Sequence, residues 1–137
     1  MYYMTRINLV PVWELSDQHL IAEWRELPRV FGLVKKKLDE RKPIIISENY
    51  TMWTGHVRFF YDKLLFLQKR HQDLVKEALK RGFRISLTEK ISLNSFPKEY
   101  CKDFSPSEQD IKISQQRILE KLQANPDFYT FYGKIYK

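Results

Sequence analysis

Apolar residues at helical spacing fill the middle of the chain and restrict it to folds built from helices. Between positions 60 and 79 they recur every three or four residues, at Phe60, Leu64, Leu67, Leu74, Val75, Ala78 and Leu79. Gly82 follows, and glycine commonly ends a helix in the left-handed conformation. This stretch is therefore predicted to be a helix with one buried face.

A second helical pattern starts at Ser16-Asp17, residues whose side chains accept hydrogen bonds from the first N–H groups of a helix. Its apolar stripe consists of Leu20, Trp24, Leu27, Phe31, Val34 and Leu38. Pro28 removes one helical N–H, so we expect a kink there without a break. The polar residues beside the stripe are expected to share one exposed face: His19, Glu23, Arg25, Glu26 and Arg29.

The third helix is predicted from Ser105-Pro106-Ser107-Glu108, a capping box in which Ser105 caps the helix and Glu108 is its third residue. Its apolar face carries Ile111, Ile118 and Leu122, its solvent side carries Arg117 and Lys121, and Asn125-Pro126 ends it. Residues 42–54 and 83–104 are predicted to be irregular connectors. The expected fold is all-α: a compact single domain of three main helices with long irregular connectors.

The composition favours a folded chain with an anionic partner. With 137 residues the chain suits one domain, and 43% hydrophobic and 15% aromatic residues supply a core. Lysine and arginine number 24 against 17 acidic residues, a net charge of +7. A polyanion such as nucleic acid is the natural partner, although charge alone also fits solubility or a membrane surface.

Cysteine and histidine usage points away from metal chemistry. Cys101 is the single cysteine, which excludes an intramolecular disulfide and suits a reducing cytoplasm. We interpret it as an inert core thiol. The three histidines are scattered without metal-binding spacing, so we expect no metal and no cofactor. No apolar run reaches the length of a membrane span, and a cytoplasmic monomer is expected.

Glu26 is the candidate catalytic carboxylate, because it lies among basic residues on its helix. An ionised carboxylate can stabilise a developing oxocarbenium ion or move a proton. An i,i+3 surface ion pair with Arg29 is the alternative that spacing alone favours. In the tail, packing is the favoured role for Phe128 and Phe131, whereas Tyr129 and Tyr132 fit packing or stacking on bases about equally.

Ten sequence segments, in order, resemble the phage pyrimidine-dimer DNA glycosylases, a family distinct from the deoxyinosine-specific endonuclease of similar name. The resemblance runs from Met4 to the C-terminus and includes a proline within a helix. The segments are Met4-Thr5-Arg6-Ile7-Asn8-Leu9, Asp17-Gln18-His19-Leu20, Glu23-Trp24-Arg25-Glu26-Leu27-Pro28-Arg29-Val30-Phe31-Gly32, Gly55-His56-Val57, Phe59-Phe60-Tyr61-Asp62-Lys63-Leu64, Leu79-Lys80-Arg81-Gly82-Phe83, Ile113-Ser114-Gln115, Arg117, Glu120-Lys121 and Tyr132-Gly133-Lys134.

This resemblance implies an all-helical domain whose N-terminal segment threads between helices and carries the α-amine of Thr5 to the lesion. In the family that amine attacks C1′ at a pyrimidine dimer, forms an imine and promotes β-elimination, with no metal. Glu26 matches the catalytic carboxylate. The positions that match DNA contacts in duplexes with dimers or abasic sites are Arg6, Gln18, His19, Arg25, Arg29, Arg117 and Lys121.

Three departures accompany the resemblance. Residues 1–4 are expected to be an extension or a misassigned start before a single domain at 5–137, because Thr5 has a free amine only after Met4 is removed. Trp24 replaces a tyrosine, and the connector between Lys37 and Thr54 is shorter, which could change the range of lesions. If Met1 is retained, the alternative function is a non-catalytic basic module that binds damaged or distorted DNA.

Overall fold

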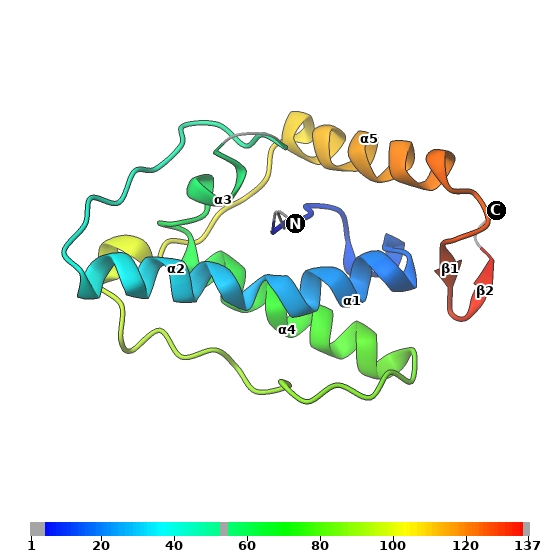
Figure 1. Cartoon of the computed structure of the whole chain (residues 1–137), viewed down its shortest axis with the longest axis horizontal. Coiled ribbons are helices and arrows are strands. Elements are labelled where there is room, and N and C mark those ends of the chain that lie inside the picture. Colours follow the sequence, from blue (N-terminus) through cyan, green and yellow to red (C-terminus); the bar gives the residue numbers. More distant parts are fainter. Residues whose placement is uncertain (1–4, 53–54, 136–137) are drawn as a thin grey trace.

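The computed structural model describes residues 5–52 and 55–135, and its main elements are helices arranged around the N-terminal segment (Figure 1). In chain order they are the 3-10 helix η1 (Val12–Glu14), α1 (Asp17–Glu26), α2 (Pro28–Asp39), α3 (His56–Phe59), α4 (Leu64–Lys80), the 3-10 helix η2 (Lys98–Tyr100) and α5 (Glu108–Ala124). A hairpin of β1 (Thr130–Phe131) and β2 (Lys134–Ile135) follows. The predicted all-α fold with three main helical segments and long connectors is confirmed.

Helices α1 and α2 follow one another end to end (Figure 1) and meet at the proline that the sequence singled out. The Ser16 side chain caps α1 by accepting a hydrogen bond from the His19 N–H, as predicted. Leu27 separates the two helices but keeps helical angles, φ −54° and ψ −43°. The missing N–H of Pro28 therefore interrupts the helix without turning the chain away from it.

The second predicted helix is confirmed from Leu64 to Lys80 but begins later than the periodicity indicated. Phe60 lies in the turn between α3 and α4, where it is buried by core packing and is not helical. Leu79 is exposed, because its neighbour Ala78 takes the buried position in the last turn. Gly82 ends the helix at φ +88°. There the N–H of Phe83 donates to the Ala78 carbonyl, which is the hydrogen bond of a Schellman motif.

The capping box of α5 lies two residues later in the chain than predicted. Ser107 is the N-cap, and its hydroxyl accepts from the Asp110 N–H while the Asp110 carboxylate accepts from the Ser107 N–H. The sequence contains two overlapping boxes, and the later one, with Asp110 as its acidic residue, is the one that forms. Asn125 is the C-cap, as predicted.

The C-terminal hairpin was not predicted. Its two-residue turn is Tyr132-Gly133, and both residues have positive φ, 53° and 82°, as tight hairpins require. The Asp17 carboxylate accepts hydrogen bonds from the Thr130 hydroxyl and from the N–H groups of Tyr132 and Gly133. The start of α1 therefore holds the hairpin in place.

One hydrophobic core joins the N-terminal segment to the helices, and its buried residues run from Ile7 to Ile118. Cys101 is half-buried at the edge of this core, and burial raises the pKa of its thiol, which supports an inert role. Among the described residues, no helix is long and apolar enough to cross a membrane.

Candidate active site

The N-terminal segment, residues 5–10, runs through the centre of the protein and is hydrogen-bonded to four helices. The Ile7 N–H donates to His56 Nε2 of α3 at 2.8 Å, and the Leu9 N–H donates to Ser114 Oγ of α5 at 2.9 Å. The Asn8 amide donates to Glu23 of α1, and the Val10 carbonyl accepts from Arg70 of α4. Thr5, at the start of this segment, is only 7% exposed. These bonds fix the position of the residues just after Thr5.

Glu26 is buried in the last turn of α1, with 12% of its side chain exposed. The prediction of an exposed polar face is therefore wrong for Glu26 and for Glu23. The reason is that the N-terminal segment and α4 cover the face that carries Glu23, and Glu26 lies three residues further on this face. The exposed Arg25 guanidinium lies 3.7 Å from the Glu26 carboxylate, and the predicted pair with Arg29 is replaced by this one.

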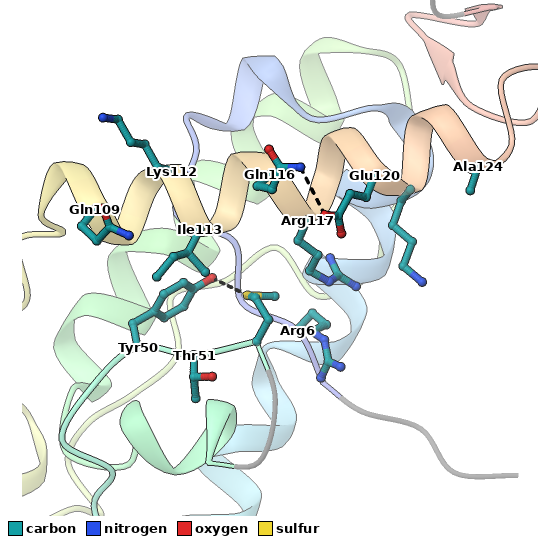
Figure 2. Close-up of a pocket in the computed structure, with 12 residues that line it drawn as sticks. Arg6, Tyr50, Thr51, Gln109, Lys112, Ile113, Gln116, Arg117, Glu120 and Ala124 are labelled. Atoms are coloured by element: carbon teal, nitrogen blue, oxygen red, sulfur yellow. Dashed lines mark hydrogen bonds between the residues drawn. The ribbon is translucent and has the colours of Figure 1, made fainter.

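An open cavity of about 830 Å³ lies between the N-terminal segment, residues 50–52 and α5. The residues that line it include Tyr50, Ile113 and four basic side chains: Arg6, Lys112, Arg117 and Lys121. In Figure 2 the side chain of Arg6, on the N-terminal segment, lies next to the end of the Arg117 side chain, which extends from α5. Thr5 is next to Arg6 in the chain, although neither Thr5 nor Glu26 lines this cavity.

Arg117 links the cavity electrostatically to Glu26. Burial, and then the positive charge of Arg6, lower the pKa of Arg117, while Tyr50, Tyr129 and Glu26 favour its charged form. The predicted position of Arg117 on the solvent side of α5 is therefore wrong, because this side of the helix faces Arg6. Two guanidinium groups so close together favour an anionic ligand, and phosphate oxygens match this chemistry.

His19 and Gln18 have partners inside the protein. The His19 ring stacks on Tyr129, with ring centroids 4.8 Å apart, and its Nδ1 lies 2.7 Å from Ser16 Oγ. Burial, Arg117 and Lys121 lower the pKa of His19 to about 4, so the ring is neutral at pH 7. Any contact of His19 with DNA would then be a hydrogen bond or a stacking contact. Gln18 binds Thr130 through both ends of its amide.

Of the predicted DNA contacts, the fold brings Arg6, Arg117 and Lys121 to one cavity. Arg25 and Arg29 are exposed on α1 and α2 and are not among the residues that line it. In the tail, Phe128 is 61% exposed, so the predicted packing is wrong for this residue. Its ring makes an edge contact with Tyr129 and lines an open pocket beside α1. Phe131 is half-buried over the Arg81 guanidinium, as packing predicted.

Sequence reasoning missed the buried ion pair that supports this site. Arg70 Nε lies 2.7 Å from the Glu23 carboxylate, and both side chains are buried. The two residues are 47 positions apart, so no helical spacing could have paired them. His56 was also missed as an individual residue, although it stands inside one of the matching segments. Among the described residues, no group of three or more histidine, cysteine or acidic side chains could hold a metal ion.

A buried carboxylate next to a basic cavity is an arrangement suited to an enzyme that acts on a polyanion. A family model described as pyrimidine dimer DNA glycosylase matches residues 4–90. The chain belongs to the pyrimidine dimer DNA glycosylase family. Its class of activity is therefore DNA repair by cleavage of a glycosidic bond, and its substrate is DNA that contains pyrimidine dimers. The match contains Thr5, Glu26 and His56, while Arg117 and Lys121 come to the site from beyond it.

The buried histidines predict loss of stability in mild acid. Burial lowers the pKa of His56 to about 4, against 6.5 for a free side chain. Between pH 6.5 and pH 4 this histidine binds a proton in the unfolded chain but not in the folded chain. Its contribution to the free energy of unfolding is therefore fully present above pH 6.5 and is lost as the pH falls toward 4. We expect His56 alone to lower the free energy of unfolding by about 2 kcal/mol between pH 7 and pH 5. Urea titrations at the two pH values measure this, and equal values would contradict it.

Proposed function

We propose that this protein excises pyrimidine dimers and then cuts the DNA strand, using the α-amine of Thr5 as nucleophile and Glu26 as its acidic partner. The observation that carries the proposal is the anchored N-terminal segment. Hydrogen bonds at Ile7, Asn8 and Leu9 hold this segment inside the protein, and Arg6, one residue after Thr5, lines the basic cavity. A terminal amine held there would lie beside a bound DNA backbone.

The proposed reaction starts with the neutral amine of Thr5. Its lone pair forms a bond to C1′ while the glycosidic bond breaks, and the departing pyrimidine takes the bonding electrons. Loss of the amine proton and opening of the sugar give an imine, and removal of a C2′ proton then expels the 3′ phosphate. Water finally hydrolyses the imine and releases the amine.

An α-amine suits this chemistry better than an exposed lysine does. Its pKa of roughly 7.7–8.0 leaves a usable neutral fraction at pH 7, whereas a lysine with a pKa of about 10.4 is almost wholly protonated. The carboxylate of Glu26 would stabilise positive charge at the sugar and assist the proton transfers. Residues 1–4, which lie outside the described residues, would have to be removed before Thr5 has a free amine.

Borohydride trapping tests the proposal. The protein is prepared in two forms, one starting at Thr5 with a free amine and one acetylated at that amine. Each form is mixed with irradiated duplex DNA and sodium borohydride, which reduces an imine to a stable amine. We expect a covalent complex with the free form alone. Strand cleavage by the acetylated form, or no complex with the free form, would contradict the proposal.

Phosphate binding at the cavity predicts a change in salt dependence. Arg117→Gln and Lys121→Gln should each reduce the slope of log K against log salt concentration by about 0.9, because one fewer counterion is released per phosphate contact. The matched control is Lys36→Gln on the exposed side of α2, which should leave the slope unchanged. Fluorescence titrations with an irradiated duplex between 50 and 200 mM salt, as is usual for such slopes, measure the effect. Identical slopes in all variants would refute phosphate binding by these two side chains.

A further inference from the structure

Ile7 is held by both of its backbone polar groups, two residues after Thr5. Its N–H donates to His56 Nε2 at 2.8 Å, and its carbonyl accepts from the Tyr50 hydroxyl at 2.9 Å. Both partners are buried side chains from other parts of the chain, and His56 is 1% exposed. A backbone unit held on both sides by side chains cannot slide along its groove without losing both bonds.

The second nitrogen of His56 determines how the ring can bind Ile7. Nδ1 lies 2.6 Å from the Thr51 carbonyl oxygen, and because a carbonyl can only accept, Nδ1 carries the proton. Nε2 then has a free lone pair, which is what the Ile7 N–H requires. Thr51, His56 and Ile7 therefore form one chain of hydrogen bonds.

The ring stays in this neutral form under working conditions. Burial and the nearby charges of Arg6 and Arg117 lower the pKa of His56 to about 4, although the bond to Thr51 acts in the opposite direction. The ring makes T-shaped contacts with two aromatic neighbours, with the Tyr50 centroid 5.4 Å away and the Phe60 centroid 5.7 Å away. A protonated ring would have two donors and could not accept from Ile7.

We propose that His56 is a positioning residue for the reaction, acting through the hydrogen bond from Ile7 to set where the terminal amine of Thr5 lies. Two residues extend at most about 7 Å, so the bond at Ile7 restricts the amine to a small region beside Arg6. This inference rests on the proposed role of Thr5. It assigns to His56 no contact with DNA and no proton transfer.

Two variants separate positioning from folding. His56→Phe keeps an aromatic ring in the core but removes the acceptor, and His56→Gln supplies a side-chain oxygen that can accept from the Ile7 N–H. We expect His56→Phe to form the borohydride-trapped complex about 10²-fold more slowly in single-turnover experiments, since small displacements of a reacting group have effects of this size. Affinity for irradiated DNA should change less than threefold, and His56→Gln should recover at least a third of the wild-type rate.

His71→Phe is the matched control, because His71 is also fully buried and neither of its ring nitrogens has a hydrogen-bond partner among the residues that the structure describes. It should react at the wild-type rate. Amide hydrogen exchange at Ile7 in the full chain gives a readout that does not depend on the imine, and we expect at least tenfold faster exchange in His56→Phe alone. Faster exchange with an unchanged rate of trapping would overturn the positioning role, as would a His56→Gln variant as slow as His56→Phe. If wild-type protein with a free Thr5 amine forms no trapped complex, the proposed function itself fails, while the exchange result still reports on the anchor.

Discussion

Replacing Glu26 by glutamine is expected to slow excision of pyrimidine dimers by about 10²–10⁴-fold, the range for loss of a general acid–base or charge-stabilising group. The amide has the shape of the carboxylate but carries no negative charge. DNA affinity should be kept or slightly increased, because Arg25 and Arg117 both lose the negative charge of Glu26 as a neighbour. Single-turnover cleavage of an irradiated duplex and a binding titration together measure the two effects.

The matched control for this variant is Glu120→Gln. Glu120 lines the same cavity and accepts a hydrogen bond from Gln116, but it is exposed on α5. Its removal changes the net charge by the same amount and should alter the excision rate less than twofold. Wild-type excision by Glu26→Gln, or equal losses in the two variants, would remove Glu26 from the mechanism.

Breaking the buried ion pair between Arg70 and Glu23 is expected to have the largest effect on stability. Arg70→Met leaves the Glu23 carboxylate buried with the Asn8 amide as its remaining partner, and an uncompensated buried charge costs about 3–5 kcal/mol. The change also removes the donor to the Val10 carbonyl, so the N-terminal segment should loosen. Urea denaturation at pH 7 measures the free energy of unfolding.

Lys69→Met provides the comparison, since Lys69 is the adjacent residue on α4 and pairs with Asp103 at the surface. Exposed pairs contribute roughly 0–1 kcal/mol, so this variant should unfold almost like the wild type. The double variant Glu23→Gln with Arg70→Met should recover part of the loss, because no buried charge then remains. A loss below about 1 kcal/mol for Arg70→Met would show that the buried pair does not hold the segment.

The fold was predictable where local chemistry decides it. The Ser16 cap, the interruption at Pro28 and the stop at Gly82 depend on residues within one or two turns. The hairpin was not predictable in the same way, because Tyr132 has positive φ, a conformation that aromatic residues seldom adopt. It forms because the Asp17 carboxylate, more than 110 positions earlier, binds three groups of the hairpin.

The candidate site was even less predictable from local sequence than the fold was. A helical projection treated the polar side of α1 as facing solvent, yet Glu23 and Glu26 are buried because another segment of the chain covers them. Arg6 and Arg117 share a cavity only because the N-terminal segment passes beside α5. Spacing within a helix contains no information on these long-range contacts, and the family resemblance supplied the residues that spacing left undecided.

In the proposed mechanism the N-terminal segment has two roles, one in stability and one in catalysis, that depend on one another. Ile7, Leu9 and Val10 are part of the hydrophobic core, and the same residues fix where Thr5 and Arg6 lie. Burial of this segment contributes to stability, and under the proposed mechanism its rigid burial would also place the terminal amine of Thr5 accurately. A nucleophile at the end of a flexible tail would sample many positions and react more slowly.

Peptide mapping of the borohydride-trapped complex tests the central claim most directly. Protein that starts at Thr5 is trapped on an irradiated duplex, digested with nuclease and protease, and sequenced by mass spectrometry to find the residue that carries the sugar remnant. Our account predicts that the remnant is bonded to the α-nitrogen of Thr5. A remnant on a lysine side chain, with the Thr5 nitrogen unmodified, would contradict it.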